Sequence, residues 1–155
     1  MKKIILLLTF IVALASCKSN PATSLDRKSQ VDIKGNWTIT SVSYVGSEYF
    51  KVNAFQIADS KCFEGSTWKF ISNNNKGDMS LNNAGCTSFS SPFIWSVNKE
   101  GNFGLKILNA GEKARKIKEG YFLRVANQTE TSFQLIDKID VGGKISDITY
   151  QFQKN

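Results

Sequence analysis

The segment Phe93-Ile94-Trp95-Ser96-Val97-Asn98-Lys99-Glu100-Gly101-Asn102-Phe103-Gly104-Leu105-Lys106-Ile107 has an apolar side chain at every second position on either side of a polar stretch. A period of two places these apolar side chains on one face of a β-strand, whereas a helix would repeat them about every 3.6 residues. Residues 98–101 have the composition of a turn. The segment therefore predicts two antiparallel strands joined by a hairpin.

The same alternation recurs along the 155-residue chain and predicts eight strands. A one-residue slip between Ile39 and Val42 in the first strand predicts a β-bulge. No stretch has a strong helical stripe, although residues 52–58 fit a short helix in the first loop. The eight alternating sets are Trp37, Ile39, Val42 and Tyr44; Trp68 and Phe70; Met79 and Leu81; Phe93, Trp95 and Val97; Phe103, Leu105 and Ile107; Tyr121, Leu123 and Val125; Phe133 and Leu135; and Ile148, Tyr150 and Phe152.

Eight short strands joined mainly by hairpins fit either an up-and-down barrel or a sandwich. Closure is the favoured arrangement because a closed barrel leaves no unpaired strand edge. We therefore expect an all-β protein that forms an eight-stranded up-and-down antiparallel β-barrel, with a short helix in the first loop.

The amino-terminal residues have the features of an exported lipoprotein. Lys2 and Lys3 precede an apolar run that is too short to span a bilayer, as in a secretory signal. Leu14-Ala15-Ser16-Cys17 has the form of a bacterial lipobox, in which the cysteine carries fatty acyl chains such as palmitate; the alternative is an ordinary secretory signal with a chance cysteine. We expect a signal peptide at 1–16, lipidated Cys17 with a flexible polar tether at 17–33, and a barrel domain at 34–155.

Several motifs resemble a known family. Gly35-Asn36-Trp37 matches the Gly-x-Trp signature of lipocalins. Residues 59–70, 119–123 and 148–152, together with Cys86, resemble the lipocalin-like lipoproteins common in Bacteroidetes, and the resemblance spans about residues 33–155. The resemblance implies an eight-stranded barrel that binds small apolar molecules.

The resemblance also implies a particular closed end. In lipocalins the tryptophan of the signature packs across the closed end of the barrel, often beneath an Arg or Lys near the end of the chain. Here Trp37 follows Gly35, and Lys154 shares the parity of Phe152 and would lie beside Trp37 if the first and last strands pair. Lys154 is thus the candidate for a cation over the indole, and Arg124 is its rival.

Counting the strands assigns each loop to one end of the barrel. Loops at about 46–65, 82–92, 109–120 and 140–144 share one end, and they include the three longest loops, as expected for a cup with a mouth. Cys62 and Cys86 both fall in these loops and are expected to form a disulfide in an exported protein. The disulfide would hold the mouth in place, or it would simply stabilise a small domain.

The aromatic residues on the strands are candidates for lining a cavity, and they could equally fill a barrel that has none. The chain has no histidine, which excludes Ser-His-Asp and Cys-His catalysis and imidazole metal sites. It also lacks a glycine-rich phosphate loop, a nucleophile elbow and a metal-spaced cluster, so we expect no enzyme, no cofactor and no metal. The candidate ligand-binding residues are Trp68, Phe70, Phe93, Trp95, Phe103 and Tyr121.

Two functions fit these features. The first is an envelope-anchored protein that binds or carries a small apolar molecule in the barrel mouth. The second is a non-catalytic module that binds another envelope protein through the open-end loops.

The net charge of +7 does not favour nucleic acid as a partner, because the aromatic residues follow strand periodicity. We expect a monomer on the periplasmic face of the outer membrane rather than on the cell surface, since Lys18 follows Cys17 and no acidic residue comes directly after it.

Overall fold

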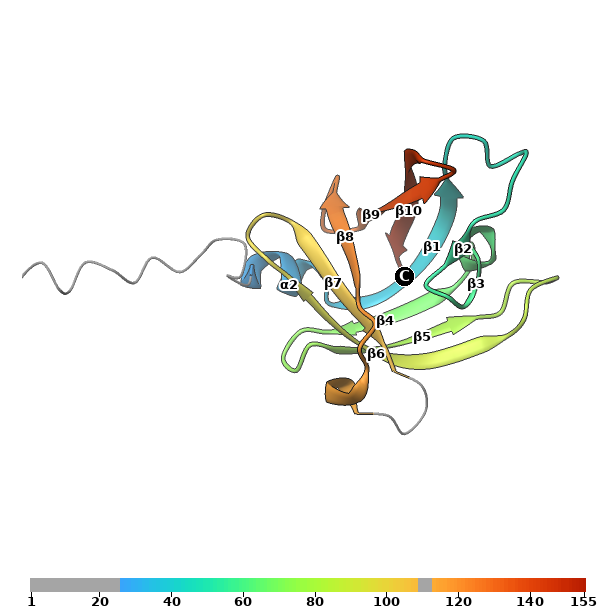
Figure 1. The fold of residues 1–155 in the computed structure, drawn as a ribbon. Helices are drawn as coiled ribbons and strands as arrows, with labels where there is room; N and C mark the ends of the chain where they lie inside the picture. The colour runs from blue at the N-terminus through green and yellow to red at the C-terminus, as the bar shows by residue number, and fades with distance from the viewer. Residues whose placement is uncertain (1–25, 109–112) are drawn as a thin grey trace, which may run out of the picture.

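A computed structural model describes residues 26–108 and 113–155, so the predicted signal peptide, Cys17 and residues 18–25 lie outside the described residues. The described part is almost entirely β-structure (Figure 1). Its elements are α2 (Arg27–Ile33), β1 (Gly35–Ser43), β2 (Asn53–Ala54), β3 (Ala58–Asp59), η1 (Ser60–Phe63), β4 (Thr67–Ile71), β5 (Lys76–Leu81), β6 (Phe89–Val97), β7 (Asn102–Ile107), η2 (Ala114–Lys116), β8 (Tyr121–Ala126), β9 (Ser132–Val141) and β10 (Lys144–Lys154).

Eight strands form a closed barrel because β1 pairs along both of its edges. The order runs β1-β10-β9-β8-β7-β6-β5-β4 and returns to β1, and every neighbouring pair is antiparallel. Trp37 lies where the two ladders meet, opposite Lys154 on β10 and Trp68 on β4. The predicted eight-stranded up-and-down antiparallel barrel is confirmed. The predicted bulge is also confirmed, since the register shifts between Ile39 and Ser41.

Aromatic side chains fill the half of the barrel around the start of β1. The ring of Phe70 has five aromatic neighbours at centroid distances of 5.2 to 6.2 Å, in addition to the stacked Trp68 at 6.1 Å. Phe133 and Phe152 stack at 4.5 Å, and Trp37 meets the edge of Phe133 at 4.7 Å. Each such pair contributes about 0.5–1.5 kcal/mol beyond its buried area. We call this packed region the closed half.

Helix α2 covers the closed half. Asp26 caps the helix by accepting hydrogen bonds from the amides of Lys28 and Ser29, and its own amide donates to the carbonyl of Val97 at 2.8 Å. Ile33, at the end of the helix, is fully buried, and its carbonyl accepts a 2.7 Å hydrogen bond from the indole of Trp37. The prediction of a flexible tether is therefore wrong for residues 27–33, because a capped helix with a buried isoleucine packs against the barrel there.

The cation expected over Trp37 is Lys154. Its Nζ lies 5.5 Å from the centroid of the indole, and its Cε passes 3.4 Å from the position that a Cβ on Gly35 would occupy. Arg124, the rival candidate, is an exposed residue of β8. Gly35, Trp37 and Lys154 thus lie together where the first and last strands meet.

The first loop does not form the helix expected over residues 52–58. Strands β2 and β3 instead form a small hairpin, which we call the mouth hairpin (residues 53–59), and the 3-10 turn η1 follows it. A turn at residues 54–57 reverses the chain, with the amide of Ile57 donating to the carbonyl of Ala54 at 3.0 Å. The helix predicted over residues 52–58 is wrong in its position because the chain reverses there, and the short helix of the first loop is the 3-10 turn η1 at Ser60–Phe63.

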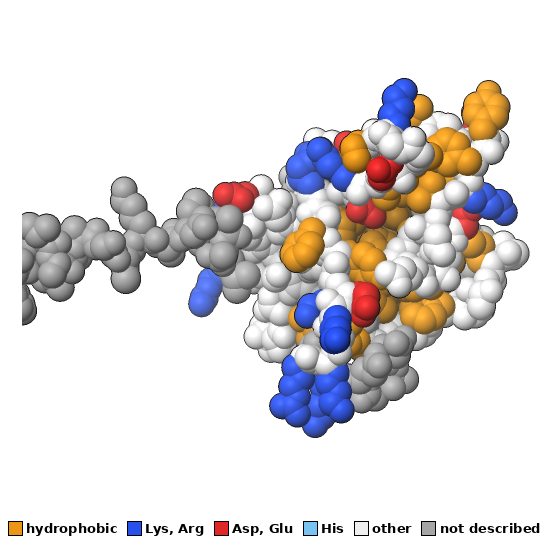
Figure 2. All heavy atoms as spheres, viewed as in Figure 1, with side chains coloured by type: hydrophobic (Ala, Val, Ile, Leu, Met, Phe, Trp, Pro, Cys, Tyr) orange, Lys and Arg blue, Asp and Glu red, His pale blue; other side chains and the backbone are white. Residues whose placement is uncertain are grey.

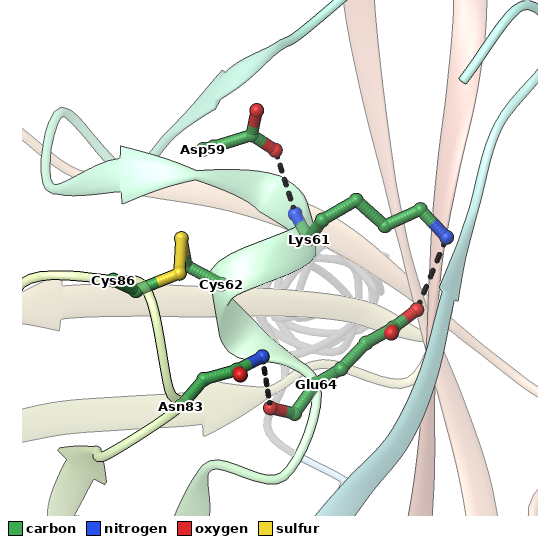
Figure 3. The surroundings of a disulfide bond; sticks show 6 residues. All are labelled: Asp59, Lys61, Cys62, Glu64, Asn83 and Cys86. Carbon is green, nitrogen blue, oxygen red and sulfur yellow. Dashed lines mark hydrogen bonds and ion pairs between the residues drawn. A yellow bond between two sulfur atoms is a disulfide. The ribbon is translucent and has the colours of Figure 1, made fainter. Parts of the chain in front are cut away.

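A disulfide joins the first loop to the loop after β5 (Figure 3). Cys62 and Cys86 have Cα atoms 5.8 Å apart, so the predicted pairing is confirmed. The side-chain amide of Asn83 donates to the carbonyl of Glu64 at 3.1 Å and forms a second link between the same loops. The carboxylate of Glu64 accepts hydrogen bonds from the amide of Val42 at 2.9 Å and from the ammonium of Lys61 at 3.1 Å. The first loop is therefore fixed to β1 and to its neighbouring loop.

Gly77 provides a test of the packed interior. A Cβ at Gly77 would come within 2.5 Å of the carbonyl oxygen of Lys69 and closer still to the ring of Phe93. We expect Gly77→Ala to lower the free energy of unfolding by about 1–3 kcal/mol in urea denaturation, because neither a backbone atom nor a buried ring can move away freely. The matched control is Gly120→Ala, whose Cβ would meet nothing closer than 3.6 Å. Equal stabilities of the two variants would contradict this packing.

The disulfide should stabilise the fold through the unfolded chain. The two cysteines are 24 residues apart, and removing a cross-link of that span costs about 3.5 kcal/mol on the chain-entropy model. We expect the double variant Cys62→Ser/Cys86→Ser to lose about this much in urea denaturation, and a reducing agent to destabilise the wild type alone. An unchanged midpoint in the variant, or two alkylated thiols in the native protein, would refute a stabilising bridge.

Candidate functional site at the open end of the barrel

The mouth hairpin places the side chain of Phe55 over the open end of the barrel. Phe55 is 7% exposed, and its ring lies 5.2 Å from Phe63, 5.1 Å from Tyr121 and 5.5 Å from Tyr150. The hydroxyl of Tyr121 donates to the carbonyl of Phe55 at 2.8 Å. Phe55 therefore covers the aromatic residues at the top of the barrel interior.

The turn that holds Phe55 has an unfavourable backbone conformation. Phe55 and Gln56 both have positive φ angles, 52° and 55°. A two-residue turn with both central residues in this region normally uses Asn, Asp or Gly, and a side chain with a Cβ costs roughly 1–2 kcal/mol there. The contacts of Phe55 with Phe63, Tyr121 and Tyr150 offset this cost. Strain of this kind is often found at ligand-binding segments.

A pocket of about 410 Å³ lies between the mouth hairpin and the segment around η2. Its apolar surface comes from the first loop, from strands β6, β7 and β8, and from Ile117, while Lys116 and Glu119 are exposed at its rim. This volume is within the range of small-molecule sites in proteins. We call it the mouth pocket, and the residues that line it are Phe55, Gln56, Ile57, Phe89, Ile107, Lys116, Ile117, Glu119 and Tyr121.

The barrel wall is incompletely paired beside this pocket. Strands β8 and β9 pair only from Arg124 opposite Ile136 to Ala126 opposite Gln134. Towards the mouth, residues 121–123 of β8 pair with β7, whereas β9 from Asp137 onward pairs with β10. The two strands diverge as a result (Figure 1), and Figure 2 shows hydrophobic and acidic side chains in the space between them.

Two ionisable side chains face the interior near this space. Asp137 has the same parity on β9 as the buried Phe133 and Leu135, and it is half-buried. Burial raises the pKa of Asp137, although the backbone amide of Lys138 partly opposes this. Burial also raises the pKa of Tyr150 well above its usual range, with the nearby charge of Asp137 adding to the effect. The raised pKa values of Asp137 and Tyr150 agree with an interior of low polarity that contains a carboxyl group.

The structure separates the six candidate lining residues into two groups. Tyr121 lines the mouth pocket. The other five are at most 2% exposed and pack against one another inside the barrel, away from that pocket; they are Trp68, Phe70, Phe93, Trp95 and Phe103. Strand parity indicated that all six point inward, but it did not indicate how far each lies from the mouth.

Other pocket residues were not identified from the sequence. Phe55 and Ile57 lie in a loop that showed no strand pattern, and Ile117 follows a run of charged residues. Ile107 fits a predicted strand, but its position in the sequence does not indicate that it lines the pocket. For Asp137 a signal was present, since a charged residue at the parity of Phe133 and Leu135 is unusual on a strand face that is otherwise apolar.

The described residues suggest no metal site or membrane helix. Within residues 26–108 and 113–155, no three His, Cys, Asp or Glu side chains are grouped so that they could hold a metal ion. In the same ranges, no helix is both long enough and apolar enough to cross a membrane.

Comparison with known proteins gives similarity in structure only. No family model matches the sequence, and no curated protein matches it. A solved lipocalin-like protein from Bacteroides uniformis is 12% identical, with a TM-score of 0.47 over 80% of this chain and 99% of the other. The odorant-binding protein from bovine nasal mucosa is also 12% identical, with a TM-score of 0.45 over 80% of this chain and 72% of the other. The strand pairing itself shows the closed eight-stranded antiparallel barrel that the lipocalin resemblance implied.

Proposed function

We propose that this protein binds a small, largely apolar molecule in the mouth pocket. The observation that supports this most directly is the pocket of about 410 Å³ between the mouth hairpin and the segment around η2, in which apolar side chains from both segments lie beside polar groups. The closed half is filled by the aromatic rings around Phe70, so the ligand lies at the mouth rather than deep in the barrel.

The same proposal explains the construction of the mouth. The disulfide and Glu64 fix the base of the first loop, whereas its tip is held in a strained turn by the packing of Phe55. A fixed base with a strained tip allows the hairpin to adjust to a ligand without unfolding the barrel. When the hairpin moves, Phe55 loses its ring contacts with Phe63, Tyr121 and Tyr150. An apolar ligand that packs on the same rings compensates for the free energy of those lost contacts.

We further propose that lipidated Cys17 holds the protein on the cell envelope, on the periplasmic face of the outer membrane. The lipobox Leu14-Ala15-Ser16-Cys17 supports the anchor, and Lys18 with no acidic residue directly after it supports the periplasmic face. Two or three acyl chains give stable membrane attachment, since each buried methylene contributes about 0.8 kcal/mol.

A second candidate function is binding to another envelope protein through the open-end loops. Val45 and Tyr49, at the start of the first loop, are 85% and 88% exposed. Exposed apolar side chains on a fixed loop are suited to a protein interface. A barrel that binds no small molecule, with these side chains required for capture of one envelope protein, would favour this function.

The pocket can be tested with a neutral apolar probe. We expect 1-octanol to bind the wild type in calorimetric titration, and Ile117→Gln to weaken binding about five- to tenfold, because about 1 kcal/mol of apolar contact is lost. The matched control is Ile145→Gln, on an exposed residue of β10 outside the pocket, which should bind as the wild type does. Absence of octanol binding, together with no small molecule in native mass spectra of detergent-free protein from its own host, would exclude the proposed function.

The membrane anchor can be tested by fractionation. We expect Cys17→Ser to move the protein from the membrane fraction to the soluble fraction, because no acyl chain can be attached to serine by this route. Lys18→Ser is the matched control and should remain in the membrane fraction. Membrane association that is the same in both variants would contradict the anchor without affecting the pocket.

A further inference from the structure

The inner face of β10 carries a buried hydroxyl group beneath the mouth hairpin, that of Tyr150. Tyr150 is 1% exposed, and its hydroxyl forms no hydrogen bond among the described residues. Its neighbour Tyr44 differs, because the hydroxyl of Tyr44 donates to the carbonyl of Phe50 at 2.9 Å. Burying a hydroxyl without a partner costs about 1–3 kcal/mol in proteins, so a partner that arrives with a ligand would recover stability.

The carboxylate of Asp137 lies in the same part of the interior. Asp137 is opposite Ile148 in the β9–β10 ladder, and Tyr150 is two residues further along β10. The two residues are therefore diagonal neighbours on the inner face, about 7–8 Å apart at the backbone, which aromatic and long side chains can span. Asp137 also raises the pKa of Tyr150, which agrees with their proximity.

The charges that face this region are negative. The hydroxyl of Tyr121 has a raised pKa because of burial, and the charges of Glu119 and Asp137 raise it further. Asp59 contributes in the same direction at Tyr150. Among the described residues, no Lys or Arg forms an ion pair with Asp137. A half-buried carboxylate without a counter-ion is costly, and a cation within the barrel would stabilise it.

A ligand can reach these groups in either of two ways. The ring of Phe55 covers Tyr150 at a centroid distance of 5.5 Å. Because the turn that holds Phe55 is strained, moving Phe55 away costs less free energy than moving a residue in a relaxed turn. The unpaired stretch between β8 and β9 also begins at Asp137, the first β9 residue beyond the β8 ladder. The polar pair is therefore adjacent to both the mouth hairpin and the opening in the wall.

We propose, as an extension of the function proposed above, that Asp137 and Tyr150 form a subsite beneath Phe55 for the ammonium group of an amphiphilic amine. The ammonium group donates hydrogen bonds to the carboxylate of Asp137 and to the hydroxyl oxygen of Tyr150, and its charge balances that of Asp137. The apolar part of the amine replaces Phe55 and extends into the mouth pocket.

The basic residues near η2 do not determine the charge of the ligand. Lys113, Arg115, Lys116 and Lys118 are exposed. Charges in water are screened over about 8–10 Å at physiological ionic strength, whereas Asp137 acts within the less polar interior. An anionic ligand would thus gain little at the rim and would be repelled inside.

The test compares three ligands of equal chain length: octylamine, 1-octanol and octanoate at pH 7, titrated calorimetrically into the wild type. We expect octylamine to bind at least about tenfold more tightly than octanol, and octanoate most weakly, because only the amine brings a positive charge that balances the carboxylate of Asp137. Octanol binding without an amine preference would overturn the subsite and leave the proposed function intact. Failure of all three ligands to bind would overturn both proposals.

Two variants separate the roles of the two side chains. We expect Asp137→Asn, which keeps the shape and removes the charge, to abolish the preference for the amine over octanol. Asp147→Asn, on the outer face of β10, is the charge-matched control and should keep the preference. We expect Tyr150→Phe to weaken amine binding without lowering the urea midpoint, since its hydroxyl has no partner in the fold. Retention of the full preference in Asp137→Asn, or a purely destabilising effect of Tyr150→Phe, would refute the subsite.

Discussion

Strand β1 pairs along both of its edges, and this double pairing closes the barrel. Trp37 faces Lys154 on one side and Trp68 on the other, so the strand that starts the barrel also closes it. Closure removes every unpaired edge in this half of the molecule and directs the alternating side chains to a common interior. The rings of Phe70, Phe133 and Phe152 then fill that interior, and α2 covers it through the hydrogen bond from Trp37 to Ile33.

The two halves of the barrel have different physical characters. The closed half is packed with aromatic rings and has its indole N–H groups satisfied, which favours rigidity. The open half has a strained turn at Phe55, a short β8–β9 ladder and an unpartnered hydroxyl on Tyr150. Features that lower local stability are concentrated where a ligand would enter, so stability and binding are located in different parts of one small domain.

Local sequence patterns were insufficient where distant residues determine the conformation. Residues 27–33 are polar enough to resemble a tether, yet the capping of α2 by Asp26 and the burial of Ile33 against the barrel make them helical. The sequence of residues 52–58 fits a short helix, but a helix of that length has little stability of its own. They form a hairpin because Phe55 gains more from packing on Tyr121 and Tyr150 than a short exposed helix would provide.

The eight barrel strands, their inward faces, the bulge after Ile39 and the pairing of Cys62 with Cys86 could be predicted from the chain alone, because strand parity and loop order are properties of the linear sequence. The folded barrel was needed to find that the inward rings around Phe70 pack as a core while Tyr121 lines a pocket, and that Asp137 lies diagonal to Tyr150. Parity specifies only the face of a strand on which a side chain lies. Its depth along the barrel depends on the stagger between strands and on loops that fold back, and these are set by contacts between residues far apart in the sequence.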